Sequence, residues 1–262
     1  FFIAFANRLA GWSAGGPAKV AVISSALCGM VSGSSVGNTV TTGSVTIPMM
    51  KKTGYHPDFA GAVEAAASTG GQIMPPIMGA AAFLMAEYMD LPYATVAVKA
   101  ILPAVLYFTG IFIAVHLEAK KLGLKGLSKD EMPKWADLGK KIYLLAPLVL
   151  LVWLVSSGAK TMQFSAAVSI LAAVIVGFLN KDERLTFKKI FEALEAGAKG
   201  AITVAVACAI AGMIAGCITV TGLASILINT IVQLAGSATF IGLILTMVCC
   251  IVLGMGVPTT AN

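Results

Sequence analysis

Oxygen-bearing side chains gather on a glycine-rich stretch early in the chain, in a pattern that could bind a metal cation. The members are hydroxyl and amide residues, namely Ser32, Ser34, Ser35, Asn38, Thr39, Thr41 and Thr42. Such oxygens, together with backbone carbonyls freed from a helix, are the ligands that a hard cation such as Na⁺ accepts. The alternative is that each hydroxyl bonds back to the preceding helical turn, as is common in membrane helices. We favour cation binding because the same half of the chain contains a broken helix.

That break is predicted at residues 70–76, which read GGQIMPP. Pro75 and Pro76 each lack an amide hydrogen and clash with the preceding turn, so a helix cannot continue through them. We expect two half-helices, roughly 58–69 and 78–89, on either side of an unwound centre. The amide groups at the start of a half-helix can hold an anionic substrate, while the unwound carbonyls can hold a cation.

Glu64 is the carboxylate that lies well inside an apolar stretch, and ionisable residues within a membrane are functional candidates. It could brace the site from behind, face a cavity or, less favoured, take part in proton coupling. Residues 33–37 also match the G-x-S-x-G motif of serine hydrolases, which requires a nearby histidine and acid. His56 and His116 fall at membrane edges in the topology below. We therefore predict that the chain is not an enzyme and uses no organic cofactor.

The composition is that of a membrane protein. Of 262 residues, 58% are hydrophobic and 11% are charged, whereas a soluble domain carries about 25% charged residues. The formal net charge of +6 would suggest nucleic acid only if the basic residues clustered on a soluble surface. They lie instead between apolar segments, as the positive-inside rule requires. We predict a lipid bilayer as the environment and no nucleic-acid partner.

Residues 119–141 are the best candidate for a cytoplasmic basic loop. Their lysines are Lys120, Lys121, Lys125, Lys129, Lys134, Lys140 and Lys141. From this loop, 142–159 and 161–180 are expected to cross outward and back, and 200–222 to cross again. Apolar and charged residues recur at helical spacing over 184–197, which favours a helix lying in the membrane interface. The alternative is a charged extension of the next span.

Residues 20–50 are apolar on both sides of a polar centre but too short for two crossings of about 20 residues each. We predict a re-entrant hairpin that enters from the cytoplasmic side, because basic residues flank both of its ends. Residues 57–90 then cross outward as the broken helix, and 238–262 begin a second hairpin from the outside. Two tips that approach from opposite sides are typical of inverted repeats around a site at the midplane.

The predicted fold is therefore an all-α polytopic membrane protein with inverted repeats, re-entrant helical hairpins and a discontinuous helix. Residues 1–118 form the first-repeat portion, and 142–262 form the second-repeat portion. The chain opens on Phe1 without a start methionine and stops without a polar tail. We expect it to be a fragment of a longer protein.

Two stretches of the sequence resemble a known family. SGSSVGNTVTTGSVTIPMMKKTGYHPDFAGAVEAAASTGGQIMPPIMGAAAF resembles the first half of the large, DctM-like membrane subunit of tripartite ATP-independent periplasmic (TRAP) transporters. LGMGVPTTAN resembles the corresponding tip in the second half. These stretches are most similar in sequence to the branch in which the small and large membrane subunits are fused and the binding protein is of the TAXI type.

The resemblance implies a multi-pass permease of the bacterial inner membrane. It would take an organic acid, such as a dicarboxylate, from a soluble periplasmic binding protein and import it with Na⁺ by an elevator motion. Its partners would be a TAXI-type binding protein and a small membrane subunit or its fused equivalent. Two alternatives stay open: an ion-coupled anion transporter or antiporter without a binding protein, and a membrane scaffold that transports nothing.

The resemblance also implies site residues. The first sodium-site region would comprise Ser32, Gly33, Ser34, Ser35, Asn38, Gly70, Gly71, Gln72 and Pro75. The second would comprise Gly254, Gly256, Pro258, Thr259, Thr260 and Asn262. The candidate substrate contacts are Ser35, Asn38, Thr39, Pro76 and Thr259.

Overall fold

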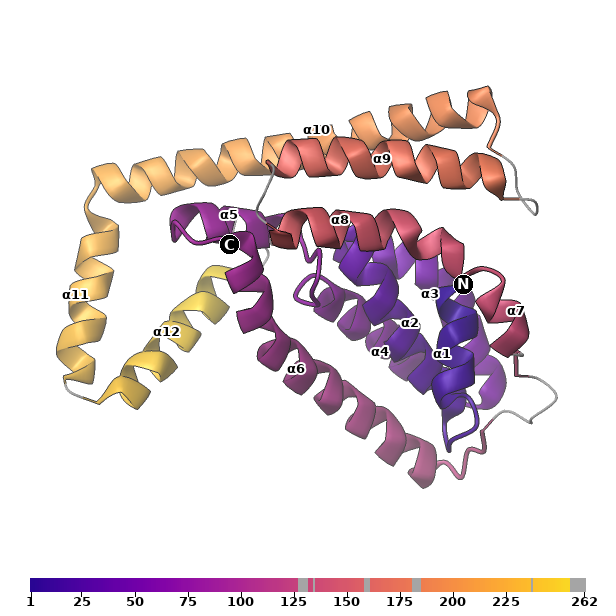
Figure 1. Cartoon of the computed structure of the whole chain (residues 1–262). Coiled ribbons are helices and arrows are strands. Elements are labelled where there is room, and N and C mark those ends of the chain that lie inside the picture. The colour runs from indigo at the N-terminus through magenta and orange to yellow at the C-terminus, as the bar shows by residue number, and fades with distance from the viewer. Residues whose placement is uncertain (127–131, 134, 158–160, 181–184, 237, 255–262) are drawn as a thin grey trace. The chain divides into compact units, whose positions relative to one another are not determined.

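The computed structural model of the chain is built from helices, with no strand in the described part. It describes residues 1–126, 132–133, 135–157, 161–180, 185–236 and 238–254. The chain divides into two compact units, Phe1–Thr186 and Phe187–Asn262. Figure 1 shows the helices of both units.

The first unit begins with a short helix and a helical hairpin. These are α1 (Phe2–Ala10), α2 (Gly16–Ser32) and α3 (Ser35–Thr53). The hairpin turns at Gly33, whose φ of 62° is a left-handed conformation that glycine adopts without strain. Ser34 then caps α3, because its hydroxyl accepts a hydrogen bond from the backbone N–H of Gly37 at 3.1 Å. The turn lies within the polar centre of residues 20–50, and the re-entrant placement of this hairpin in the membrane stays a prediction.

The next segment is the discontinuous helix, formed by α4 (Pro57–Gly71) and α5 (Ala80–Tyr88). Residues 72–79 between them are not helical, in agreement with the break predicted from the two prolines. Tyr93, at the start of the next helix, contacts this unwound segment through its hydroxyl. Its hydroxyl donates to the carbonyl of Ile77 and lies 3.2 Å from the carbonyl of Pro76.

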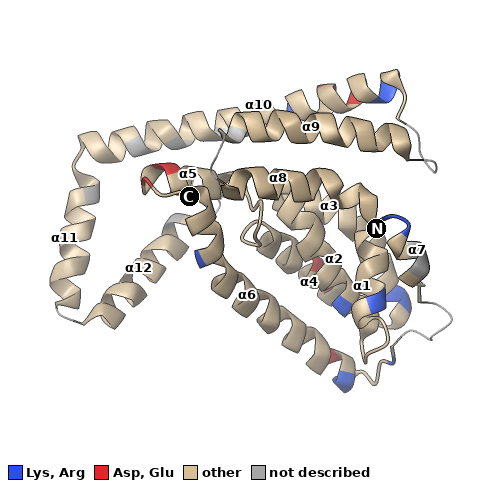
Figure 2. Cartoon of the chain, viewed as in Figure 1, with Lys and Arg blue, Asp and Glu red and all other residues tan. Residues whose placement is uncertain are grey.

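Four further elements complete the first unit. They are α6 (Tyr93–Lys121), α7 (Trp135–Gly139), α8 (Ala146–Ser157), which a 3₁₀ turn (Ile142–Leu145) precedes, and α9 (Met162–Leu179). Among the described residues, α6 alone is long and apolar enough to cross a bilayer as a single helix. Figure 2 shows that the charged residues of α6 lie towards its two ends, while α8 and α9 contain none.

The second unit consists of α10 (Phe187–Val220), α11 (Leu223–Ala235) and α12 (Thr239–Gly254). The apolar end of α10, Cys208–Val220, and Ser225–Ala235 together satisfy the length and hydropathy of one span, but they meet at an angle of 69°. Most of the residues over which an interfacial helix was predicted, 184–197, belong to the start of α10. From Phe187 onward these residues form the first part of α10, because Gly197 and Gly200 do not interrupt the helical backbone.

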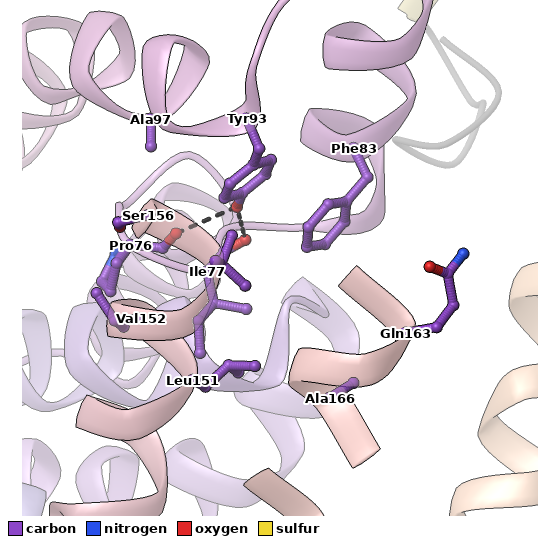
Figure 3. Close-up of a pocket in the computed structure, with 11 residues that line it drawn as sticks. Pro76, Ile77, Phe83, Tyr93, Ala97, Leu151, Val152, Ser156, Gln163 and Ala166 are labelled. Carbon is purple, nitrogen blue, oxygen red and sulfur yellow. Dashed lines mark hydrogen bonds between the residues drawn. The ribbon is translucent and has the colours of Figure 1, made fainter. Parts of the chain in front are cut away.

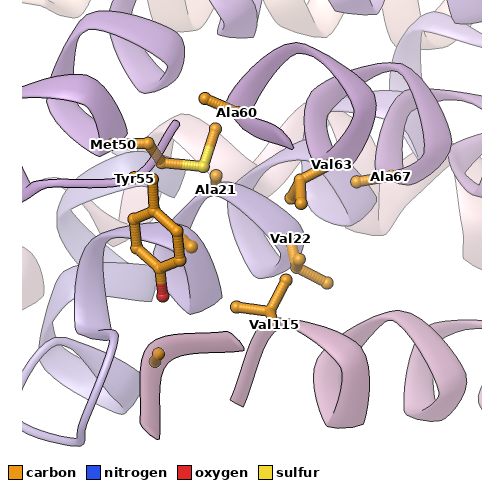
Figure 4. Packing of buried hydrophobic residues seen from close by; sticks show 10 residues of the cluster. Ala21, Val22, Met50, Tyr55, Ala60, Val63, Ala67 and Val115 are labelled. Atoms are coloured by element: carbon orange, nitrogen blue, oxygen red, sulfur yellow. The ribbon is translucent and has the colours of Figure 1, made fainter. Parts of the chain in front are cut away.

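The core of the first unit lies where the hairpin packs on α4 and α6 (Figure 4). Its buried members are mostly small, namely Ala18, Ala21, Val22, Met50, Tyr55, Ala60, Val63, Ala67, Val115 and Ala119. Small side chains let helices approach closely, which is how helices associate in lipid. The discontinuous helix is thereby held against both arms of the hairpin.

Candidate functional site

The two arms of the candidate site meet at a glycine crossing between α2 and α4. A methyl group at Gly29 would lie 2.6 Å from Cα of Gly71, and one at Gly71 would lie 2.5 Å from Cα of Gly29. Neither position can carry a side chain without separating the helices. The hairpin turn also touches the unwound segment, since a methyl group at Gly79 would lie 3.1 Å from the carbonyl of Gly33. The structure thus brings together the polar hairpin turn and the broken helix.

Several predicted hydroxyls bond locally. Thr39 donates to the carbonyl of Ser35, and Thr41 donates to that of Gly37, both at 2.8 Å. Ser34 serves as the cap of α3, and its side chain is exposed, as is that of Ser32. Thr39 and Thr41 therefore bond back to the preceding helical turn, which was the alternative to cation binding considered from the sequence.

Asn38 differs from these residues because it is buried, with 1% of its surface exposed. Its amide nitrogen donates to both the carbonyl and the hydroxyl of Ser25, each at 2.8 Å. The amide oxygen, Oδ1, has no hydrogen-bond partner among the described residues. A buried oxygen without a donor costs free energy. Asn38 also adjoins the glycine crossing, because its nitrogen lies 3.0 Å from the position of a methyl group at Gly29.

A second buried group, centred on Glu64, lies next to Asn38. Oε1 of Glu64 accepts hydrogen bonds from Ser25 and Ser68, both at 3.1 Å, and from Thr42. Oε2 accepts from Thr46. Glu64 has no exposed surface. Four hydroxyls from α2, α3 and α4 therefore surround one carboxylate.

This group was only partly foreseen. Glu64 and Thr42 were singled out from sequence, but Ser25, Thr46 and Ser68 were not. A local signal for two of them existed, because Thr46 follows Thr42 by four residues and Ser68 follows Glu64 by four, which places each pair on one helix face. Ser25 had no such signal, since only the fold brings α2 against α4.

The carbonyls of the broken helix are mostly engaged. Those of Gly70 and Gly71 accept turn hydrogen bonds from Ile73 and Met74, at 3.1 and 3.2 Å. The carbonyl of Gln72 accepts from the N–H of Gly79 at 2.8 Å. Backbone carbonyls retain a second lone pair, so these oxygens can still serve as cation ligands.

A cavity of about 340 Å³ lies beside the unwound segment, which contributes Pro76 and Ile77 to its lining (Figure 3). It is lined by Pro76, Ile77, Phe83, Tyr93, Ala97, Leu151, Val152, Val155, Ser156, Gln163 and Ala166. No side chain in this lining carries a positive charge, and most are apolar. The cavity offers a carboxylate no counter-charge and therefore does not match an anion site.

The residues present fit a sodium ion better than a transition metal. The described residues contain no group of three or more His, Cys, Asp or Glu side chains that could hold a metal. What they provide is amide, hydroxyl and carbonyl oxygen, with Asn38 Oδ1 left without a donor. Of the second predicted region, Gly254 ends α12, and Gly256, Pro258, Thr259, Thr260 and Asn262 lie outside the described residues.

Comparison with known proteins identifies the family. A family model described as "Tripartite ATP-independent periplasmic transporter, DctM component" matches residues 1–262. The chain is 26% identical to the C4-dicarboxylate TRAP transporter large permease protein DctM of Pseudomonas aeruginosa, over 70% of this chain and 43% of the relative. It is also 26% identical to the sialic acid TRAP transporter large permease protein SiaM of Vibrio cholerae, over 66% of this chain and 40% of the relative.

A putative TRAP transporter large permease protein of Haemophilus influenzae is 27% identical over 97% of this chain and 59% of the relative. This chain thus spans about half the length of these relatives. The match confirms the family predicted from the two motifs, and the family is one of multi-pass membrane permeases rather than of enzymes. The chain belongs to the DctM component family of tripartite ATP-independent periplasmic transporters.

Proposed function

We propose that the complete protein is the large permease subunit of a sodium-coupled TRAP transporter that imports an organic acid. The observation that carries the proposal is the buried amide oxygen of Asn38, which has no donor and adjoins the crossing of the hairpin with the broken helix. A coupling ion favours one conformation only if it binds that conformation more tightly than the other, and a site built from two separate elements makes such a difference possible.

Sodium suits this position. Asn38 would hold the ion through Oδ1, with support from carbonyls of the hairpin turn and the broken helix, the region that includes Gly33, Gly70 and Gly71. When bound, the ion would link the hairpin to α4 by ligands from both. The remaining predicted ligands, Ser32, Ser34, Ser35, Gln72 and Pro75, and the second region that begins at Gly254, stay part of the proposal.

An organic acid is the substrate class that the helix geometry favours. Helix α3 begins at Ser35 with no acidic residue in its first turn, so its free amide groups and helix dipole are available to a carboxylate. Ser35, Asn38, Thr39, Pro76 and Thr259 remain the candidate contacts. The names of the relatives, which mention C4-dicarboxylate and sialic acid, are consistent with this class.

Membership of the tripartite family supports the partners and the location that we propose. We expect a periplasmic binding protein of the TAXI type, a small membrane subunit or its fused equivalent, and residence in the bacterial inner membrane. The portions 1–118 and 142–262 would form the two repeats on either side of the loop 119–141, and the hairpins would move as an elevator.

Uptake of labelled organic acids into proteoliposomes of the complete permease tests the proposal. The assay compares a sodium gradient with an equal potassium gradient, each with and without the cognate binding protein. Uptake that needs both sodium and the binding protein is expected. Uptake without the binding protein would favour an autonomous anion transporter, and absence of uptake under every condition would favour a scaffold role.

A further inference from the structure

Glu64 is not among the residues predicted to bind the ion. The hydroxyl of Ser25 nevertheless connects it to Asn38, which is one of them. We propose that Glu64 is a positioning residue for the cation site: its buried negative charge, acting through Ser25, orients Asn38 and attracts a sodium ion to Asn38 Oδ1. The inference rests on the proposed sodium coupling and adds to it the group that supplies the counter-charge.

The first step is that the carboxylate has no cationic partner. Glu64 is fully buried, and no ion pair among the described residues includes it. On α2, Lys19 bonds instead to Ser13 and His116, at 2.9 and 3.0 Å. On α3, Lys51 and Lys52 are exposed at the end of the helix.

The other titratable groups around Glu64 do not supply a positive charge either. On α6, Tyr107 donates its hydroxyl to the carbonyl of Ala66 at 2.9 Å. On α2, the nearby Cys28 carries a thiol, which cannot neutralise a carboxylate. Four hydroxyl donors solvate the carboxylate without cancelling its charge. A cation bound nearby would neutralise the negative charge of Glu64.

The second step is that Ser25 transmits the orientation of Glu64 to Asn38. The Ser25 hydroxyl donates to Glu64 Oε1 at 3.1 Å, which leaves its oxygen free to accept from Asn38 Nδ2 at 2.8 Å. The Ser25 carbonyl accepts from the same nitrogen at 2.8 Å. Both amide hydrogens are therefore used on Ser25, and the amide oxygen is the end of Asn38 that remains for a ligand.

The third step is electrostatic. Only one hydroxyl separates the carboxylate from the Asn38 amide, and both groups are buried. Charges interact strongly over such short paths when water is excluded. The charge of Glu64 would thus raise the affinity of a cation at Asn38 Oδ1 without direct coordination, as groups behind the ligands of other metal sites do.

The test is a sodium titration of the purified complete permease, followed by thermal unfolding. Choline replaces sodium so that ionic strength stays constant, and the midpoint of the rise in Tm reports sodium affinity, because a ligand that binds the folded state stabilises it. Glu64→Gln keeps the shape and removes the charge, so we expect its midpoint to increase by roughly 10- to 100-fold. Glu87→Gln, the same change at an exposed residue of α5, is the matched control and should leave the midpoint unchanged.

Unfolding without sodium separates this role from a purely structural one. We expect Glu64→Gln to unfold at or above the wild-type Tm, because replacing an unpaired buried charge by a neutral group of similar size removes a desolvation cost. A residue that only braced the helices would lower Tm and leave the sodium midpoint in place. If Glu64→Gln does not fold, Ser25→Ala keeps the charge but removes the hydroxyl link, and its midpoint should also increase.

The inference would be overturned if Glu64→Gln had the same sodium midpoint as the wild type. If Glu64→Gln does not fold, an unchanged midpoint in Ser25→Ala would overturn it. An equal increase in Glu87→Gln would overturn it as well. If the wild type retained sodium-driven uptake in either case, the proposed function would stand while this inference failed. A wild type that sodium neither stabilises nor drives in uptake would overturn both.

Discussion

Gly29 and Gly71 are in direct backbone contact, with no room for a methyl group at either position. Gly29 lies in α2, the first arm of the hairpin, and Gly71 is the last residue of α4. Their contact holds the polar turn of the hairpin beside the unwound part of the broken helix. The candidate ion site therefore depends on a close packing of two helices as well as on its ligands.

Gly71→Ala should destabilise the permease. The added methyl group would lie 2.5 Å from Cα of Gly29, so the helices must separate, and overpacking of this kind costs about 1–3 kcal/mol in the free energy of unfolding. Gly61→Ala on the same helix is the control, because a methyl group there meets nothing within 4 Å. Helix propensity should make that change neutral or stabilising. Thermal unfolding of both variants checks the prediction, and equal Tm values would contradict it.

Asn38→Ala should weaken sodium activation of uptake. The change removes the unpartnered oxygen, Oδ1, so we expect the sodium concentration for half-maximal uptake to increase by roughly tenfold or more. Thr41→Ala removes an exposed hydroxyl that bonds only to the carbonyl of Gly37 and should leave sodium activation unchanged. Uptake at a series of sodium concentrations measures both variants. Identical sodium curves for Asn38→Ala and wild type would exclude Asn38 from the site.

Thr46→Val should lower stability because it removes the described donor to Glu64 Oε2. A buried carboxylate oxygen left without its donor costs about 1–3 kcal/mol in the free energy of unfolding. Ser44→Ala, which removes an exposed hydroxyl two residues away on α3, should change this free energy by less than about 0.5 kcal/mol. Chemical denaturation compares the two. A Thr46→Val protein as stable as Ser44→Ala would show that the carboxylate does not need this hydrogen bond.

Tyr55, in the turn between α3 and α4, should make stability depend on alkaline pH. Burial, followed by the nearby charge of Glu118, raises the pKa of Tyr55 to about 12, above the value of 10 expected for the unfolded chain. The neutral phenol is thus favoured in the folded state. Its contribution to stability is complete below pH 10 and is lost as the pH rises through 12.

The measurement for Tyr55 is the difference in unfolding free energy between wild type and Tyr55→Phe at several pH values. As the pH rises above 10, the wild type should lose stability relative to Tyr55→Phe, because phenylalanine cannot ionise. Tyr143→Phe, at a half-exposed tyrosine of the 3₁₀ turn, serves as the control. A pH-independent difference for Tyr55→Phe would contradict the prediction.

The local breaks in the fold were predictable from sequence because short-range chemistry decides them. Two adjacent prolines end α4 near Gly71, and a glycine–serine pair turns the hairpin at Gly33, as expected from the conformational limits of these residues. The motifs around the same positions were also specific enough to indicate the TRAP family, which the family match confirms.

What the sequence by itself determined, then, is a membrane-embedded helical protein with a polar hairpin and a broken helix, because composition, proline and glycine act locally. The tertiary structure alone decided which polar residues meet. Hydroxyl-rich positions look alike along the chain, yet Thr39 and Thr41 bond within α3 while Ser25, far away in sequence, joins Asn38 to Glu64. That selection depends on the contact of α2 with α4, where two glycines allow the backbones to touch, and such long-range packing is not encoded in any single stretch of residues.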